Sequence, residues 1–196
     1  MVTDAQIILA SASPRRRELL DQIGIRALVH AVDIDESPKT NEAVLDYVQR
    51  LAVEKARAGF QLFAQDQTLP VLGSDTVVEL AGTILGKPEN SMHAKQILRQ
   101  LSEKKHTVHT SVAIVTIEQE FIETSSTQVQ FKKLEEQEIN DYVATGEPND
   151  KAGAYAIQGL AAQFIENIDG SFSGVMGLPL YETAQLLKRC GIQSLG

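Results

Sequence analysis

Short apolar runs alternate along this chain with segments whose apolar residues recur at every third or fourth position. Residues 7–10 and 71–80 are apolar runs of the kind typical of buried strands. Between them, apolar spacings of three and four predict a long helix over residues 42–58, with Asn41 as its N-cap and Gly59 as its end. The pattern therefore predicts a chain that mixes helices and strands.

The rest of the pattern adds elements of both kinds. The turn Ala81-Gly82 indicates a hairpin between residues 71–80 and 83–85. The remaining predicted elements are a strand over 28–32, a strand pair over 109–117 and 121–131, and helices over 14–23, 91–101, 135–144 and 179–189, with Ser13 and Ser91 as N-caps. We expect a mixed fold of class α/β or α+β, whose topology the order of the elements does not fix.

Composition narrows the partners and the compartment. The chain has 196 residues, enough for one large domain or two closely joined lobes, and a formal net charge of −8. Such an acidic chain is unsuited to long nucleic acid, because phosphate neutralisation needs a basic surface. Cys190 is the single cysteine, which excludes an internal disulfide and a cysteine-rich metal site. Since no signal-peptide pattern and no membrane-length apolar run is present, we expect a cytoplasmic protein without a membrane partner.

A helix start rich in hydroxyl and guanidinium groups is the first candidate for chemistry. Residues 11–16 read Ser-Ala-Ser-Pro-Arg-Arg and join the first predicted strand to the first helix. Free backbone N–H groups and the positive dipole end at a helix N-terminus favour an anion such as phosphate. Serine hydroxyls and planar guanidinium groups add donors that match phosphate oxygens. A capped surface helix with solvated arginines is the alternative, which these residues alone leave open.

Two charged residues occupy apolar patterns. Asp75 falls inside the apolar strand 71–80, where a carboxylate is costly to bury unless a metal, an ion pair or acid–base work explains it. The alternative is an aspartate at a strand end or bulge, and we favour function. Lys55 lies on the apolar stripe of helix 42–58, so it either points into a cleft or snorkels from the edge of the core. Snorkelling is the better interpretation of Lys55 taken alone.

Two loops carry the remaining candidates. Lys87 precedes Pro88 just after the hairpin, and the rigid proline could aim Lys87 back at Asp75. Residues 147–159 combine charges and glycines as in a loop that approaches a ligand closely. In that loop, the amide of Gln158 has a donor and an acceptor that can match the N3–H and O4 edge of uracil or thymine. A turn followed by an exposed glutamine is the alternative, which spacing does not reject.

Taken together and in this order, these segments resemble the Maf family of nucleotide pyrophosphatases. The matching segments, which extend over almost the whole chain, are 11–20 (SASPRRRELL), 35–36 (DE), 52–56 (AVEKA), 73–78 (GSDTVV), 86–88 (GKP), 150–155 (DKAGAY) and 177–180 (GLPL). The resemblance implies a twisted central sheet flanked by helices in two lobes with a deep cleft, as in the related ITPase-like fold, formed by one domain over residues 1–196.

The resemblance also implies a hydrolase reaction. A Maf enzyme splits a nucleoside triphosphate between its α and β phosphorus atoms, with a divalent cation such as Mg²⁺ or Mn²⁺, into monophosphate and diphosphate. The segment Ile157-Gln158-Gly159, with Arg15 and Thr76, resembles the branch that acts on dTTP and UTP. The implied general base is Asp75, the implied metal ligands are Glu36 and Asp75, and the implied substrate-binding or specificity residues are Ser11, Ser13, Arg15, Arg16, Lys55, Thr76, Lys87, Lys151 and Gln158. Whether Asp75 binds the metal directly or through a water stays open.

Three functional readings remain at this point. The first is a dTTP and UTP pyrophosphatase that cleans the nucleotide pool and is linked to arrest of cell division. The second is the same chemistry on methylated guanine or other modified nucleotides, and the third is a non-catalytic regulator of septum formation. A small-molecule nucleotide is the expected partner, and a homodimer is compatible with the sequence, which does not fix the oligomeric state. The joint presence of Glu36, Lys55, Asp75 and Lys87 favours an enzyme.

Overall fold

A single mixed sheet runs through the computed structural model, which describes residues 4–63 and 69–194. The strand order is β2-β1-β3-β5-β6-β7, and β4 pairs with β3 beside this path. The strands are β1 (Ile7–Leu9), β2 (Ala27–Val29), β3 (Val71–Leu80), β4 (Thr83–Leu85), β5 (Lys105–Val115), β6 (Glu120–Phe131) and β7 (Ile165–Asp169). Strand β1 pairs in parallel with β2 and with β3. Strand β4 pairs antiparallel with β3, and β7 pairs antiparallel with β6.

Helices alternate with the strands along the chain. They are α1 (Pro14–Gln22), α2 (Val44–Leu62), α3 (Ser91–Leu101), α4 (Glu136–Ala144), α5 (Phe172–Met176) and α6 (Leu180–Arg189), with the 3₁₀ segments η1 (Ala152–Ala154) and η2 (Leu160–Phe164). The mixed α/β class with a helix-flanked central sheet is confirmed. Within the described residues, no helix has both the length and the apolar character that crossing a membrane requires.

Contacts divide the chain into two compact units. Unit 1 comprises Met1–Asp75, Thr110–Ser125 and Gly177–Gly196, and unit 2 comprises Thr76–His109 and Ser126–Met176. Strands β3, β5 and β6 therefore each contribute residues to both units.

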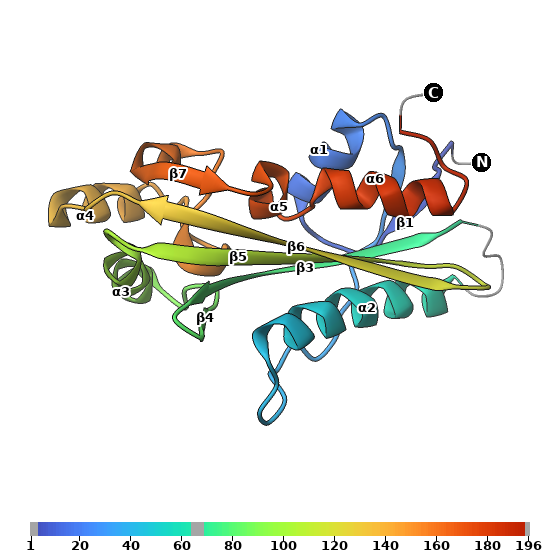
Figure 1. Ribbon diagram of the computed structural model, residues 1–196, viewed down its shortest axis with the longest axis horizontal. Helices are drawn as coiled ribbons and strands as arrows, with labels where there is room; N and C mark the ends of the chain where they lie inside the picture. The colour runs from blue at the N-terminus through green and yellow to red at the C-terminus, as the bar shows by residue number, and fades with distance from the viewer. Residues whose placement is uncertain (1–3, 64–68, 195–196) are drawn as a thin grey trace. The chain divides into compact units, whose positions relative to one another are not determined.

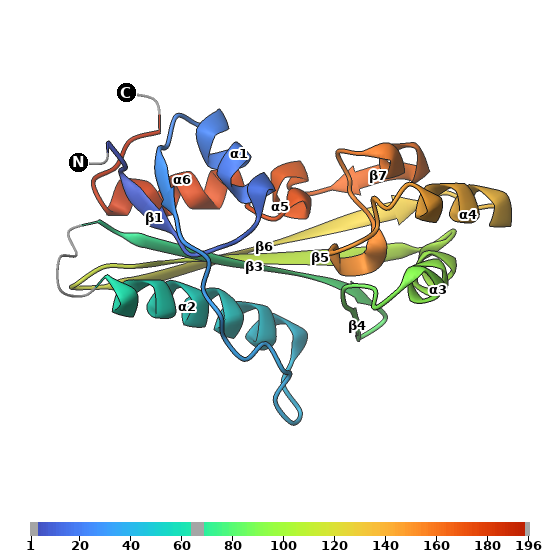
Figure 2. The ribbon, with the colours of Figure 1, turned by 180° about the vertical axis from the view of Figure 1, so that it is seen from behind.

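Close packing of α2 on the strands organises unit 1. Helix α2 lies on one face of these strands, and α1 and α6 lie on the other (Figures 1 and 2). Small side chains permit the approach, since Ala52 and Ala56 of α2 pack against Ala113 and Val115 of β5. A Cβ at Gly73 of β3 would collide with the backbone of both α2 alanines. The glycine and the alanines thus bring the α2 backbone against β3, beside Lys55 on the helix and Asp75 on the strand.

The bounds predicted for α2 are wrong at both ends. The helix begins at Val44 after Ala43, and Asn41 instead has a positive φ of 59°. It continues to Leu62, because Gly59 is an interior position of close approach rather than a C-terminal signal. A Cβ on Gly59 would lie 2.9 Å from side-chain atoms of both Ala10 and Val71. Tertiary packing, not helix termination, explains this glycine.

Other local predictions fare unequally. The hairpin of β3 and β4 is confirmed, and its turn has positive φ at Ala81 (50°) and Gly82 (82°), as a type I′ turn requires. The N-cap of α3 is Asn90, not Ser91, since the Asn90 side chain accepts a hydrogen bond from the His93 backbone N–H at 2.9 Å. Ser13 occupies the N-cap position of α1 without a side-chain capping bond. Strand β5 begins at residue 105 rather than 109, and β7 and the short helical segments η1, η2 and α5 were not predicted.

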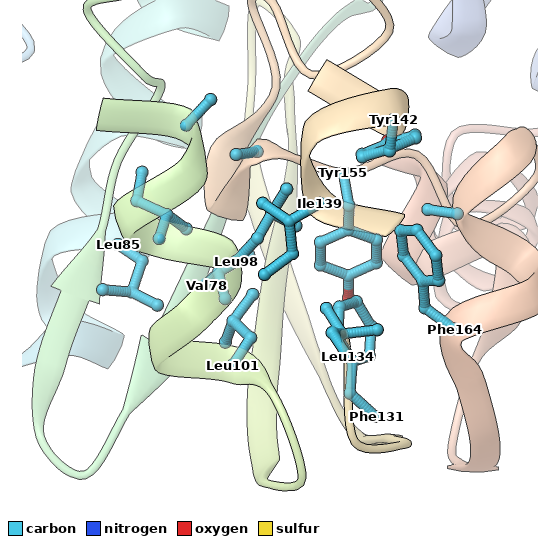
Figure 3. Close-up of a cluster of buried hydrophobic side chains, with 14 of the residues drawn as sticks. Val78, Leu85, Leu98, Leu101, Phe131, Leu134, Ile139, Tyr142, Tyr155 and Phe164 are labelled. Carbon is cyan, nitrogen blue, oxygen red and sulfur yellow. The ribbon is translucent and has the colours of Figure 1, made fainter. Parts of the chain in front are cut away.

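Unit 2 has a core of aromatic and aliphatic side chains from its strands and from α3 and α4 (Figure 3). Phe131 makes edge-to-face contacts with Tyr155 and Phe164, at centroid distances of 4.9 and 6.2 Å. One polar ring is enclosed in this core. His106 is 2% exposed and its ring lies edge-on to those of Phe131 and Tyr155.

His106 is held in its neutral form. Its Nε2 lies 2.9 Å from the hydroxyl oxygen of Tyr155, whereas Nδ1 has no hydrogen-bond partner among the described residues. Burial lowers the pKa of His106 from 6.5 to about 4. A proton on the buried ring would have no counter-charge, so the imidazole enters the fold only when neutral.

We predict that this histidine makes the fold sensitive to acid. The unfolded chain takes up the proton near pH 6.5, whereas the folded chain takes it up only near pH 4. The stability present above pH 6.5 is therefore lost as the pH falls, by about 2 kcal/mol between pH 7.5 and pH 5. Denaturant unfolding of the wild type and of His106→Gln at both pH values should show a smaller pH dependence in the variant. Equal pH dependence of the two proteins would contradict the assignment.

Candidate active site

A buried ammonium group forms the centre of the candidate site in unit 1. Lys55 of α2 is 9% exposed, and its Nζ lies 2.7 Å from Asp75 Oδ1 of β3 and 2.6 Å from Glu36 Oε1. The interpretation of Lys55 as a snorkelling lysine is wrong, because its charge is directed to two carboxylates instead of to water. This pairing gathers the two expected metal ligands around one cation.

Asp75 is an interior residue of β3 with 7% exposure, so it is neither at a strand end nor in a loop. The Lys55 ammonium offsets the cost of removing the carboxylate from water. A fixed carboxylate of this kind can accept a proton from water or coordinate a cation.

The loop that carries Glu36 is fastened to the start of α2. Tyr47 donates its hydroxyl hydrogen to the Glu36 backbone oxygen at 2.8 Å, and Arg50 Nη2 donates to the Ser37 backbone oxygen at 3.1 Å. Arg50 also forms an ion pair with Glu42, with Nε 2.6 Å from Oε1. Burial, then the charges of Asp75 and Glu36, raises the pKa of Tyr47, so its hydroxyl stays a donor.

Tyr47 and Arg50 were not among the predicted site residues. Tyr47 falls among the apolar positions spaced by three and four in the predicted helix 42–58, and that pattern gives no sign of its hydroxyl contact. The contacts of Tyr47 and Arg50 with the loop of residues 35–42 become visible only in the tertiary structure.

The start of α1 supplies donors on the same unit. Arg16 Nη1 donates to Ser11 Oγ at 3.0 Å, and the Ser13 backbone N–H donates to the same oxygen at 3.2 Å. Burial lowers the pKa of Arg16; the Coulombic effect of Arg15 acts in the same direction, and those of Asp75 and Glu36 oppose it. A guanidinium nevertheless stays charged in proteins. Arg16 is thus hydrogen-bonded to Ser11 and lies close enough to Asp75 and Glu36 for their charges to act on it.

The carbonyl of Gly177 links the start of α1 to the strand that carries Asp75. Arg16 Nε donates to this oxygen at 2.8 Å, and the buried Ser74 hydroxyl donates to it at 3.1 Å. Ser74 directly precedes Asp75 in β3. The Gly177 carbonyl, in a segment that the sequence offered only as part of a resemblance, therefore joins Arg16 to Ser74 beside the candidate site.

The other predicted residues belong to unit 2. Lys87 and Gln158 are exposed, and Thr76 and Lys151 are partly buried. The Gly153 backbone N–H donates to the Gly86 backbone oxygen at 3.1 Å, which joins the segments that carry Lys87 and Lys151.

The carboxylates suit a hard divalent cation in kind. Mg²⁺ binds oxygen, commonly through one or two carboxylates with waters and substrate phosphates. Glu36 and Asp75 already contact one cationic nitrogen. Within residues 4–63 and 69–194, no group of three or more His, Cys, Asp or Glu residues could hold a metal by itself. The carboxylates of Glu36 and Asp75 are therefore the acidic oxygen donors that the described residues gather around Lys55.

Among solved structures, the match to the structure of the Staphylococcus aureus Ham1 protein covers 64% of this chain and 71% of that chain, with 13% identity and a TM-score of 0.42. A likeness at this level carries no argument about function.

Similarity to curated proteins extends over nearly the whole chain. A protein named dTTP/UTP pyrophosphatase from Hahella chejuensis (strain KCTC 2396) is 50% identical to this chain. The match covers 96% of this chain and 94% of the relative. The same name belongs to a relative from Nitrosomonas europaea (strain ATCC 19718 / CIP 103999 / KCTC 2705 / NBRC 14298), 50% identical over 98% of this chain and 99% of the relative. A third relative with this name, from Aromatoleum aromaticum (strain DSM 19018 / LMG 30748 / EbN1), is 51% identical over 95% of this chain and 96% of the relative. The family model described as Maf-like protein matches residues 6–190, and the chain belongs to the Maf family.

Proposed function

We propose that this chain is a hydrolase that splits dTTP and UTP into the nucleoside monophosphate and diphosphate. The observation that carries the proposal is the Lys55 ammonium between the carboxylates of Asp75 and Glu36, on the unit that also holds the serines and arginines of the α1 start. The relatives named dTTP/UTP pyrophosphatase, about half identical over nearly the whole chain, support the substrate class.

In this proposal Asp75 is the general base. Water adds across the anhydride between the α and β phosphorus atoms, the bridging P–O bond breaks, and a proton passes to the carboxylate. Lys55 holds Oδ1 at 2.7 Å and so orients the group. We assign proton uptake to Oδ2. Phosphoryl transfer depends mainly on the positioning of the reactants and on the stabilisation of charge in the transition state. A carboxylate held in one orientation would position the attacking water.

The triphosphate would bind the cationic groups. Ser11, Ser13, Arg15 and Arg16 offer hydroxyl and guanidinium donors, and we propose Lys87 and Lys151 as further phosphate-binding residues. Such a concentration of positive groups offsets substrate charge in a chain whose net charge is −8.

Gln158 would recognise the base. Its amide can pair with both the N3–H and the O4 of uracil or thymine, with Thr76 and Arg15 adjusting the fit. A base with reversed donors and acceptors would leave polar groups unpaired, which disfavours cytosine. The methyl group that separates thymine from uracil is weakly discriminated, so both nucleotides are expected substrates.

We propose Glu36 and Asp75 as the residues that hold a divalent cation, Mg²⁺ or Mn²⁺. When bound, this cation supplies charge neutralisation and a more acidic water. A single functional domain over residues 1–196 is part of the proposal, supported by a family match over residues 6–190. Action in the cytoplasm on free nucleotides, without nucleic acid as a partner, and dimer formation stay predictions.

Replacement of the base tests the mechanism. We predict that Asp75→Asn lowers the turnover of dTTP by about 10²–10⁴-fold, the usual contribution of a general base. Diphosphate release, coupled to an inorganic pyrophosphatase, measures the rate, and circular dichroism checks the fold. Asp21→Asn is the matched control, since Asp21 is an exposed aspartate of α1, and it should keep the wild-type rate. A folded Asp75→Asn protein with near-normal turnover would defeat the mechanism.

Loss of one carboxylate tests the metal site. We predict that Glu36→Gln raises the Mg²⁺ concentration for half-maximal activity by roughly tenfold or more, since half of the acidic ligand set is removed. Calorimetric titration of the protein with Mn²⁺ and a non-hydrolysable dTTP analogue should show the same weakening without turnover. Unchanged cation affinity in both measurements would remove Glu36 from the ligand set.

Base recognition is tested at an exposed position. We predict that Gln158→Ala lowers the ratio of kcat/KM for dTTP over that for CTP by about tenfold or more, because paired hydrogen bonds to the base are lost. Its melting temperature should match the wild type, since the side chain is exposed. Gln100→Ala, at an exposed glutamine of α3 in unit 2, is the control. An unchanged ranking of dTTP, UTP, CTP and methylated GTP would reject Gln158 as the base reader.

A further inference from the structure

We propose that Glu147 is a positioning residue that fixes the turn carrying Gln158 and thereby sets the preference for the base. This inference rests on the proposed function, in which Gln158 reads the pyrimidine. Every residue in the argument belongs to unit 2.

The carboxylate of Glu147 binds the backbone on the C-terminal side of Gln158. Leu160 donates its backbone N–H to Oε2 at 2.9 Å, and Ala161 donates to Oε1 at 3.3 Å. These two residues begin η2, and Gln158 lies two positions before Leu160. A charged acceptor on two successive amides is a strong constraint on a short turn.

Gly159 allows the carboxylate this close approach. A Cβ on Gly159 would collide with all three atoms of the Glu147 carboxyl group. The Gly159 backbone N–H also donates to the Ala156 backbone oxygen at 3.0 Å, which closes the turn around Gln158. The carboxylate can occupy its present position beside the turn because residue 159 has no Cβ.

The N-terminal side of the turn is held through Tyr142. The Ala156 backbone N–H donates to the Tyr142 hydroxyl oxygen at 3.3 Å, and that hydroxyl donates to Glu147 Oε1 at 2.9 Å. Burial, then the hydrogen bond to Glu147, raises the pKa of Tyr142, so its hydroxyl stays protonated. The ring lies edge-on to Phe164 at 5.1 Å, within the core of unit 2 (Figure 3).

Both ends of the turn 156–161 therefore depend on one hydroxyl and one carboxylate, while the Gln158 side chain stays exposed. A rigid turn presents the amide in one orientation before the substrate arrives, which removes an ordering cost and excludes alternative pairings. A loose turn would let the amide adapt to other bases. Glu147 should therefore affect the choice among bases more than the rate of phosphoryl chemistry.

The test compares base preference in Glu147→Gln, Gln158→Ala and the double variant. We expect Glu147→Gln to lower the dTTP to CTP ratio of kcat/KM by about tenfold, with kcat for dTTP changed less than KM. Because Glu147 acts through Gln158, the double variant should lose no more preference than Gln158→Ala alone. Glu166→Gln, an exposed glutamate of β7 in the same unit, is the matched control and should keep the wild-type ratio.

Hydrogen exchange provides a readout that needs no turnover. In Glu147→Gln, the amides of Leu160 and Ala161 should exchange faster, whereas those of α3 should keep their wild-type protection. If Glu147→Gln does not fold, Tyr142→Phe, which loses only the hydroxyl, serves for the same measurements.

An unchanged ratio in Glu147→Gln, or a loss that adds fully to that of Gln158→Ala, overturns the inference while leaving the proposed function intact. An unchanged ratio in Gln158→Ala removes base reading from the proposed function, and this inference falls with it. Faster exchange at Leu160 and Ala161 with a reduced ratio supports the positioning role.

Discussion

A buried ammonium between two carboxylates is the interaction on which the site of unit 1 depends. The side chains of Lys55 and Asp75 are about one-tenth exposed, at 11% and 10%, so water solvates neither charge well and each depends on the other for compensation. Removing one partner of such a pair costs about 3–5 kcal/mol, because the other charge stays buried without compensation. The groups proposed to carry out the chemistry are thus also the groups that stabilise each other, which is why each variant needs its own folding control.

Backbone contact makes this ion pair possible. Gly73 and the alanines at 52 and 56 let α2 and β3 approach to a distance that larger side chains would forbid. The ammonium of a long lysine then reaches a carboxylate on the strand instead of solvent. Tyr47 and Arg50, on the same helix, bring the loop of Glu36 to the other side of that ammonium. Small residues in the sequence therefore determine where the charged ones meet.

In unit 2, hydrogen bonds rather than an ion pair hold the polar groups around the candidate base-recognition residue. Its core is apolar and aromatic, and the polar atoms at its edge belong to groups such as Tyr142 and Glu147 that order the neighbouring turn. His106 is accepted in this core as a neutral ring, at the cost of sensitivity to acid. Buried polar groups in both units thus specify conformation, and each needs a defined partner to do so.

The sequence by itself determined the elements whose signals are local, and the family. Periodicity and turn residues suffice for the β3–β4 hairpin and for α3, α4 and α6, and the ordered motifs indicated the family that the similarity to known proteins confirms. Tertiary structure decided that Gly59 lies inside a helix, that Lys55 points at carboxylates, and that Glu147 reaches the turn after Gln158. These outcomes depend on atoms far apart in the chain, and a spacing pattern contains no information about which distant partner fills the space or compensates the charge.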